Sequence, residues 1–228
     1  MTEKLLLKAA KFVANEMIEG DYLEFGIYQG ASMVNAANAI RDGFERRINT
    51  KLNNQDNLQR LKRENLFRKI QLVGFDSFEG LPKLTNIDSY SDDFKEGQYS
   101  CGLEYVKKNI VNRLTKINTR TDNIKLVKGW FEETVNASTF KSLSIDKAAI
   151  INIDSDLYSS ASTVLNEVVD LIHDGTVLIF DDWFAFKGNP NKGEQRAFAE
   201  WKLANPGIIT TEFHSEGVYK KSFICHRV

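Results

Sequence analysis

The sequence is poor in the residues that carry disulfide and zinc chemistry. Its 228 residues include two cysteines, Cys101 and Cys225, and three histidines, His173, His214 and His226. Two cysteines cannot form the disulfide framework of a small secreted protein, and their spacing does not match a zinc site. We expect reduced structural thiols and structural or exposed histidines. Neither a P-loop nor a G-x-S-x-G motif is present, so nucleoside-triphosphate and serine-hydrolase chemistry lack support.

The sequence also has no excess of one charge and no long apolar run. Lysine and arginine number 30 against 31 aspartates and glutamates, so the chain offers no general attraction to nucleic acid or to an anionic membrane. No run approaches the roughly 18 apolar residues of a membrane span, and charges interrupt the N-terminal apolar residues, unlike those of a signal peptide. We expect a cytoplasmic protein that binds a small molecule and neither nucleic acid nor membrane.

What the sequence does contain is a regular alternation of helical patterns with short runs rich in valine and isoleucine. This alternation is typical of βα units that build a parallel sheet, and 228 residues suit one such domain. Strands are predicted at residues 21–26, 71–75, 123–128, 148–153, 176–180, 207–213 and 218–225. Helices are predicted at residues 1–20, 32–46, 104–117, 159–173 and 193–204. We predict a single α/β domain over residues 1–228, whose mostly parallel seven-stranded sheet is flanked by helices.

Two segments interrupt this alternation. Residues 45–69 contain eight basic residues against three acidic ones and indicate a basic helical insertion at about residues 43–70. This insertion could bind an anionic partner or substrate, but we favour a solvated helical excursion. Residues 81–97 are polar and rich in aspartate and serine, and loops of that length often serve as lids.

The first predicted strand runs into a glycine-bearing loop at the start of a helix, with the sequence Glu24-Phe25-Gly26-Ile27-Tyr28-Gln29-Gly30-Ala31-Ser32. Backbone N–H groups at a helix N-terminus favour an anionic ligand group. Tyr28 occupies the place of the second glycine of a dinucleotide-binding loop, which disfavours NAD. The Glu24 carboxylate suits a ligand with an ammonium or sulfonium charge, and S-adenosylmethionine carries both. The alternative is a strand-to-helix turn without a ligand.

Asp76 ends the second predicted strand, where an acidic side chain typically accepts hydrogen bonds from ribose hydroxyls. It lies 50 residues beyond Gly26, against the roughly 20 of a dinucleotide fold, and the basic insertion accounts for the excess. The alternative is a surface acid that caps a turn.

Four aspartates follow two successive strands. Asp154 and Asp156 come after residues 148–153, and Asp181 and Asp182 come after residues 176–180. The carboxyl ends of neighbouring parallel strands open on one crevice, so these carboxylates should converge there. Crowded carboxylates repel unless a proton or a cation neutralises them, and oxygen ligands suit Mg²⁺, Mn²⁺ or Ca²⁺. Such an ion would hold and acidify a substrate hydroxyl while a nearby carboxylate takes the proton. The alternative is that these acids cap helices and loops.

Together these residues resemble the bacterial TylF-type, or macrocin, O-methyltransferases, metal-dependent enzymes that methylate sugar hydroxyls in antibiotics and related metabolites. The similarity extends over most of the chain and lies in five ordered segments: LEFGIYQGAS at 23–32, GFDSFEGLP at 74–82, KGWFEET at 128–134, IDSDLYSSA at 153–161 and IFDDW at 179–183. The resemblance implies a Rossmann-like class I methyltransferase fold. It also implies S-adenosylmethionine and a divalent ion such as Mg²⁺ as cofactors.

The resemblance assigns roles to residues by their position in these motifs. It places around the methionine part of the cofactor Glu24, Gly26, Tyr28, Gly30 and Ser32. It assigns the ribose to Asp76 and Ser77, and the adenine to Trp130 and Phe131, which without the resemblance would be interpreted as core aromatics. It assigns the metal to Asp154, Asp181 and Asp182, and the general base to either Asp154 or Asp156.

Two features differ from the family pattern. About 20 residues precede the first strand, which is fewer than relatives carry, and the basic insertion is unusual. The acceptor is therefore expected to be a sugar of a natural product, a glycoside or a polysaccharide, and a homodimer is expected to close the pocket. The alternatives are a non-catalytic protein that binds S-adenosylmethionine and a metal-dependent hydrolase that uses the aspartate cluster.

Overall fold

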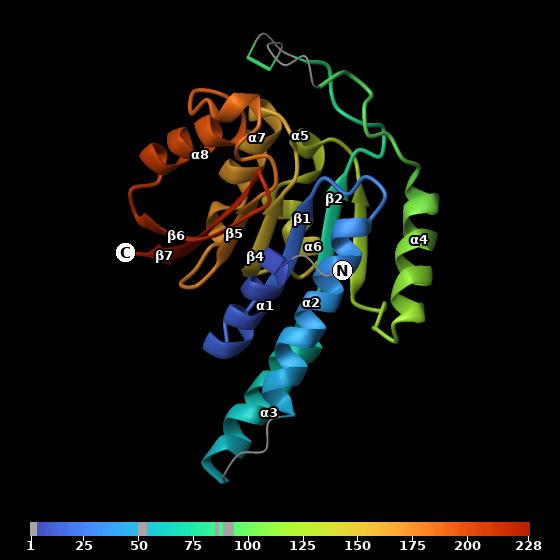
Figure 1. The fold of residues 1–228 in the computed structure, drawn as a ribbon, viewed down its shortest axis with the longest axis vertical. Coiled ribbons are helices and arrows are strands. Elements are labelled where there is room, and N and C mark those ends of the chain that lie inside the picture. Colours follow the sequence, from blue (N-terminus) through green and yellow to red (C-terminus); the bar gives the residue numbers. More distant parts are fainter. Residues whose placement is uncertain (1–3, 50–53, 85–86, 89–93) are drawn as a thin grey trace.

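The structure is a computed structural model that describes residues 4–49, 54–84, 87–88 and 94–228. Its centre is a seven-stranded sheet in the order β3-β2-β1-β4-β5-β7-β6 (Figure 1). The strands are β1 (Asp21–Phe25), β2 (Leu72–Asp76), β3 (Ile124–Lys128), β4 (Ala148–Ile153), β5 (Val177–Phe180), β6 (Ile208–Glu216) and β7 (Lys220–Arg227). Strands β1 to β5 run parallel, whereas β7 pairs antiparallel with both β5 and β6.

Helices cover both faces of this sheet. They are α1 (Lys4–Glu16), α2 (Ala31–Ile48), α3 (Asn54–Lys69), α4 (Leu103–Lys116), α5 (Phe131–Thr134), α6 (Ala137–Ser142), α7 (Tyr158–Glu167) and α8 (Gly193–Ala204). Successive residues of a strand point to opposite faces, so Tyr22 and Ile150 join one core with α1, α2 and α4. Leu23 and Ile151 join a second core with α6, α7 and α8. Among the described residues, no helix is long and apolar enough to cross a membrane.

The predicted fold class is confirmed, because all seven predicted strands overlap observed strands of a mostly parallel sheet. The helix predicted at residues 159–173 is shorter: α7 ends at Glu167, and a 3-10 turn follows at Val169–Leu171. Helices α5 and α6 and a second 3-10 turn at Phe186–Gly188 were not predicted, because such short segments carry no periodic apolar pattern.

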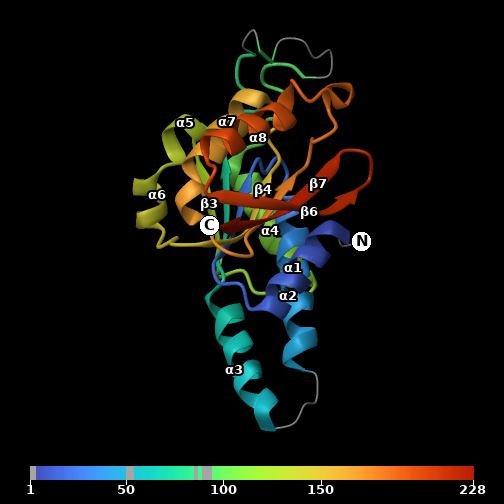
Figure 2. The same ribbon diagram turned by 90° about the vertical axis from the view of Figure 1, so that its left-hand side faces the viewer.

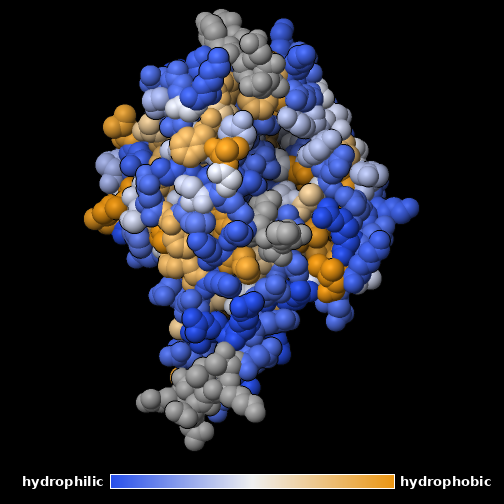
Figure 3. All heavy atoms as spheres, in the orientation of Figure 1, coloured by the Kyte–Doolittle hydropathy of each residue, from blue (hydrophilic) through white to orange (hydrophobic). Residues whose placement is uncertain are grey.

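The basic segment forms the second half of a helical hairpin. Helix α3 returns alongside α2, and the pair projects from the end of the sheet opposite the carboxyl ends of the parallel strands (Figures 1 and 2). Residues 57–62 are exposed, and hydrophilic residues cover the described part of this end (Figure 3). Arg63 is instead buried, and its guanidinium donates to the carbonyl oxygens of Ala14 and Asn15 at 3.0 and 3.3 Å. Lys51, another of the eight basic residues of this segment, lies outside the described residues.

The predicted lid at residues 81–97 is described in part, because residues 85–86 and 89–93 lie outside the described chain. Asp88 is buried and accepts hydrogen bonds at the start of α7, from Tyr158 N at 2.8 Å and from Ser159 N at 3.3 Å. The described part of this segment is therefore attached next to the residues that follow β4.

Candidate active site

A cavity of about 290 Å³ opens at the carboxyl ends of the parallel strands. The residues that line it come from the loop after β1, the end of β2, the start of α5 and the turns after β4 and β5. They are Gly26, Ile27, Tyr28, Asp76, Ser77, Gly80, Leu81, Pro82, Tyr99, Trp130, Phe131, Glu132, Asp154, Ser155, Asp156, Ser160, Asp181 and Asp182. Residues assigned separately to a cofactor and to a metal ion thus share one cavity.

The loop after β1 is held close to the turn after β4. Gly26 has a φ of +96°, and a Cβ atom there would stand 1.8 Å from the carbonyl oxygen of Asp154, so only glycine fits. Asp76 organises the same loop: its Oδ2 accepts hydrogen bonds from Ile27 N at 2.6 Å and Tyr28 N at 3.1 Å. Its other oxygen accepts from Phe78 N at 2.6 Å. The carboxylate proposed for the ribose therefore also shapes the loop that faces the cavity.

Three residues assigned to the methionine part lie outside the cavity lining. Glu24 is buried and accepts hydrogen bonds from the Tyr22 hydroxyl at 2.6 Å and from the Ser32 hydroxyl. Gly30 has a φ of +79° and caps the start of α2, where a Cβ atom would meet the Ile110 side chain at 2.6 Å. Among the described residues, Gly26 and Tyr28 therefore line the cavity. Glu24, Gly30 and Ser32 stabilise the loop without lining the cavity.

The residues assigned to ribose and adenine lie on the β2 side of the cavity. The Ser77 hydroxyl donates to the Gly80 carbonyl at 3.1 Å and accepts from Glu79 N at 3.0 Å, so it already closes a turn. Phe131 packs edge-on against Phe25 with ring centroids 5.9 Å apart. Trp130 and Phe131 both line the cavity while remaining only partly buried, so an aromatic surface is available to a flat ring.

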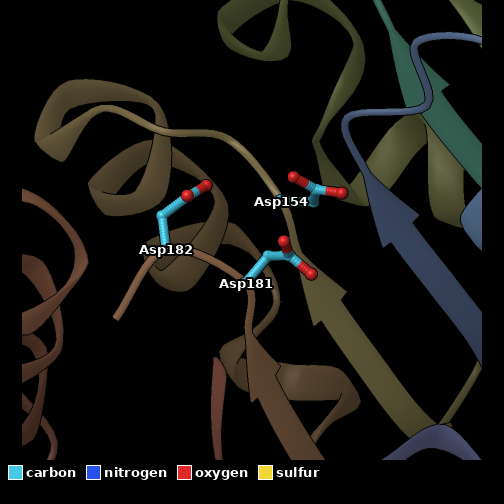
Figure 4. A group of neighbouring side chains, drawn as sticks. All are labelled: Asp154, Asp181 and Asp182. Atoms are coloured by element: carbon cyan, nitrogen blue, oxygen red, sulfur yellow. The ribbon is translucent and has the colours of Figure 1, made fainter. Parts of the chain in front are cut away.

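Three of the four predicted aspartates form a compact carboxylate group. Strands β4 and β5 pair Ile153 with Phe180, so Asp154 and Asp181 leave the sheet side by side. Oxygens of Asp154, Asp181 and Asp182 all lie within 4.8 Å of one another (Figure 4). Three oxygen ligands at this spacing fit one hard divalent ion better than zinc.

The electrostatics of the cluster also favour a cation. Burial, followed by repulsion from Asp181 and Asp182, raises the pKa of Asp154 well above its ordinary value. Burial and the charge of Asp182 raise the pKa of Asp156 to about 8, and burial together with Asp181 raises the pKa of Asp182 to about 6. Carboxyl groups in such surroundings stay charged at neutral pH only when a cation neutralises them.

Two residues that contact the cluster were not predicted from the sequence. The Lys220 ammonium lies 2.5 Å from Asp181 Oδ1. Glu194 is buried, and its Oε2 accepts a hydrogen bond from Asp182 N at 3.0 Å. Burial, with the charges of Asp182 and Asp181, raises the pKa of Glu194 well above its ordinary value. No local sequence signal identifies either residue, since one begins β7 and the other lies in the first turn of α8.

A pair of tyrosines lies at the exposed side of the cavity. Tyr28 and Tyr99 are 44% and 42% exposed, and their rings meet edge to face at 5.5 Å. Both have a left-handed backbone, with φ of 45° and 64°, which is uncommon for bulky residues and recurs at functional sites. Burial, with the charges of Asp156 and Asp182, raises the pKa of Tyr99, which places this ring near the aspartates. Tyr99 was not predicted as a site residue.

Residues 59–206 match the model of the macrocin O-methyltransferase (TylF) family. The chain belongs to this family. The matched region contains β2 to β5 and four of the five segments quoted above, whereas the LEFGIYQGAS segment, which contains the loop after β1, precedes it. The resemblance drawn from the sequence is thereby confirmed.

Curated relatives of this TylF-family chain are O-methyltransferases by name. The mycinamicin III 3''-O-methyltransferase of Micromonospora griseorubida is 23% identical over 169 residues, which are 73% of this chain and 56% of the relative. The demethyldecarbamoylnovobiocin O-methyltransferase of Streptomyces niveus is 26% identical over 114 residues, which are 47% of this chain and 40% of the relative. The chain thus spans about half the length of the curated relatives it matches.

Solved structures show the same fold at low sequence identity. The O-methyltransferase NovP has a TM-score of 0.71 at 16% identity, with 98% of this chain and 79% of that chain covered. The calicheamicin methyltransferase has a TM-score of 0.69 at 20% identity, with 96% and 77% covered. These likenesses confirm the Rossmann-like methyltransferase fold of the TylF-family chain.

Proposed function

We propose that this TylF-family protein is an O-methyltransferase that uses S-adenosylmethionine and a divalent metal ion to methylate a sugar hydroxyl. One observation carries the proposal: the carboxylate group of Asp154, Asp181 and Asp182 lines the same cavity as the loop after β1. A methyl donor on the loop and a hydroxyl on the carboxylates would then meet in one enclosed space. The name of one curated relative, the 8-demethyl-8-(2,3-dimethoxy-alpha-L-rhamnosyl)-tetracenomycin-C 4'-O-methyltransferase of Streptomyces olivaceus, includes a rhamnosyl group and supports transfer to oxygen on a sugar.

On the cofactor side, the backbone of Gly26 to Tyr28 would face the methionine part of the cofactor. The hydrogen bond between Glu24 and Ser32 would hold this loop in place. Asp76 accepts two N–H groups on Oδ2 and one on Oδ1, which leaves a lone pair of Oδ1 for a ribose hydroxyl. Trp130 and Phe131 would flank the adenine. Related structures in complex with S-adenosylhomocysteine, including an O-methyltransferase of Bacillus cereus with a TM-score of 0.57 at 13% identity, support this cofactor class.

On the acceptor side, Asp154, Asp181 and Asp182 would hold the metal ion. The chemistry that such an ion would supply is Lewis acidity toward the acceptor hydroxyl, whose oxygen would accept the methyl group while the cofactor would leave as the thioether. Asp156 lies outside the group of three yet lines the cavity, so we assign it as the base that takes the hydroxyl proton. Asp154 then serves as a ligand only.

The tyrosine pair Tyr28 and Tyr99 would border the acceptor. Partly exposed rings beside the aspartates offer a flat apolar surface to a sugar ring, and their hydroxyl groups can bond its oxygens. A glycoside, a polysaccharide or a natural-product sugar all meet these requirements. We also infer that a homodimer covers this exposed side, and sedimentation velocity tests it by distinguishing one chain from two.

The function is tested by methyl transfer from labelled S-adenosylmethionine to a panel of rhamnosides, in Mg²⁺ and in EDTA. The wild type is compared with Asp181→Asn and with Asp170→Asn, a control at a fully exposed aspartate. We expect Asp181→Asn to lose transfer while it still binds S-adenosylhomocysteine in calorimetry, and Asp170→Asn to behave like the wild type. Failure of the wild type to bind S-adenosylhomocysteine, or full metal-dependent transfer by Asp181→Asn, would reject the proposal.

A further inference from the structure

Lys220 is held beside the aspartate cluster by the backbone of the sheet. It begins β7, which pairs antiparallel with β5, the strand that ends at the aspartates. Phe184 N donates to the Tyr219 carbonyl oxygen at 3.2 Å, so the segment after β5 is bonded to the residue before Lys220. This arrangement brings the Lys220 ammonium to 2.5 Å from Asp181 Oδ1. The backbone of Lys220 is therefore fixed by the fold beside the strand that leads into Asp181.

The charge of Lys220 acts on the cluster as a whole. Its side chain and that of Asp181 are 24% and 22% exposed, so solvent and salt screen the pair less than they screen an ion pair at the surface. The same ammonium lowers the pKa of Asp182, against the effect of burial. Among the described residues, it is the basic side chain that forms an ion pair with the cluster.

We propose that Lys220 is the resident counter-cation of the aspartate cluster: it neutralises Asp181 when no divalent ion is bound, and it competes with the ion for that carboxylate. This inference rests on the metal site of the proposed function. Lys220 is on this view a positioning residue, because it sets the charge and the orientation of a ligand and does not itself contact the reacting atoms.

The proposal predicts opposite effects on metal affinity and on the stability of the metal-free protein. An ion on Asp154, Asp181 and Asp182 would share the Asp181 carboxylate with the ammonium, and like charges at such short range repel strongly. Removal of the lysine charge should therefore tighten metal binding. Without metal, the same removal leaves the crowded carboxylates without a counter-charge and should destabilise the fold. A lysine with a purely structural role would instead lower stability without tightening metal binding.

The test is a calorimetric titration of the full chain with Mn²⁺, without cofactor or acceptor. Lys220→Met removes the charge, Lys220→Arg retains it, and Lys221→Met is the matched control on the same strand, where Lys221 pairs with the exposed Glu212 at 2.7 Å. We expect Lys220→Met to bind Mn²⁺ roughly tenfold more tightly than the wild type. Lys220→Arg and Lys221→Met should keep the wild-type affinity. In EDTA, Lys220→Met should unfold at a lower temperature than the wild type, and Mn²⁺ should reduce that difference.

Equal or weaker Mn²⁺ binding by folded Lys220→Met would overturn the proposal. If Lys220→Met does not fold in EDTA, circular dichroism with and without Mn²⁺ decides the matter: recovery in Mn²⁺ supports the proposal, and Lys220→Gln then provides the affinity. Absence of Mn²⁺ binding by the wild type and by Lys220→Met alike would overturn the metal site itself. If both proteins bind Mn²⁺ and Lys220→Met does not bind it more tightly than the wild type, only the role of Lys220 is overturned.

Discussion

Asp154 and Asp156 lie two residues apart in one turn, yet they have different surroundings. Asp154 belongs to the group whose oxygens lie within 4.8 Å of one another, whereas Asp156 lies beside that group in a left-handed backbone conformation with a φ of 60°. The left-handed residue turns its side chain away from the direction that a regular turn would give it. A difference in backbone conformation thus separates a proposed ligand from a proposed base.

This difference predicts distinct phenotypes for two isosteric variants. Asp156→Asn should lower kcat by roughly 10²- to 10⁴-fold, the usual contribution of a general base, while Mn²⁺ affinity changes little. Asp154→Asn should lose Mn²⁺ binding because it removes a ligand. Steady-state kinetics and Mn²⁺ titration measure the two effects. Loss of Mn²⁺ binding in Asp156→Asn with retention in Asp154→Asn would reverse the assignment.

Asp21 is a buried acid away from the cavity, and it predicts a pH dependence of stability. Burial raises its pKa to about 6, although Gln71 N donates to its Oδ1 at 2.8 Å. The folded state therefore holds a proton more tightly than the unfolded state, so the stability contributed by this group is present below about pH 4 and is lost as the pH rises through 6. Asp21 then carries an unfavourable buried charge at neutral pH.

Asp21→Asn should remove this cost while keeping an oxygen that accepts the Gln71 N–H bond. We expect the variant to exceed the wild type in free energy of unfolding by roughly 1–3 kcal/mol at pH 7.5, and to match it near pH 4. Urea denaturation across this pH range measures the difference, with Asp170→Asn as a fully exposed control. A gain that did not vary with pH would argue against a titration effect.

At the scale of elements, Arg63 connects the hairpin of α2 and α3 to α1. Residues 57–62 of α3 are exposed, whereas Arg63 reaches across to α1 and donates to carbonyl groups in its last turn. A cation at the C-terminus of a helix satisfies free carbonyl groups and interacts favourably with the helix dipole. One arginine of the basic segment thus has a structural role that its neighbours lack.

Arg63→Met should lower the free energy of unfolding by about 1–3 kcal/mol, because the α1 carbonyl groups would remain buried without partners. Arg60→Met is the matched control, since the exposed Arg60 lies 3.7 Å from Glu64 in a pair one turn apart, and its effect should stay within about 0.5 kcal/mol. Urea denaturation of both variants compares them. Equal losses would indicate that the basic charge of the hairpin matters rather than this contact.

For the whole molecule, the parallel strands converge on one cavity, while the basic hairpin occupies the opposite end (Figure 1). The cavity is lined by the end of β2 and by the segments that follow β1, β4 and β5, which belong to both halves of the chain. Ligands that bind there connect these segments only in the folded state, and ligand binding should therefore stabilise the whole fold.

Thermal unfolding should report this coupling. At about 100 times its dissociation constant, a ligand adds about 2.7 kcal/mol, which corresponds to a rise in Tm of roughly 5–10 °C for a chain of this size. Mn²⁺ and S-adenosylhomocysteine should each produce such a rise in the wild type. Asp181→Asn should lose the rise in Tm with Mn²⁺ and keep the rise with S-adenosylhomocysteine. Differential scanning fluorimetry measures both. Retention of the full Mn²⁺ effect by Asp181→Asn would place the ion elsewhere.

The elements that could be predicted from the sequence are those with local signals. Short apolar runs predicted the five parallel strands, because buried parallel strands need continuous apolar residues. Aspartates directly after such runs could be placed at the carboxyl edge, since parallel strands end on the same side of a sheet. The loop of Gly26 to Gly30 was recognisable because a glycine-bearing segment runs from a predicted strand into a predicted helix.

Other features depend on contacts between residues far apart in the chain. Lys220 reaches Asp181 across 39 positions because β7 enters the sheet antiparallel beside β5. Glu194 reaches Asp182 because α8 packs over the same strand end, and Asp76 bonds the loop after β1 because β2 adjoins β1. The sequence by itself determined the parallel sheet, the family and the acidic strand ends, whose signals are local. Only the tertiary structure decided which cations and backbone groups surround those acids, because strand order and helix packing bring them together.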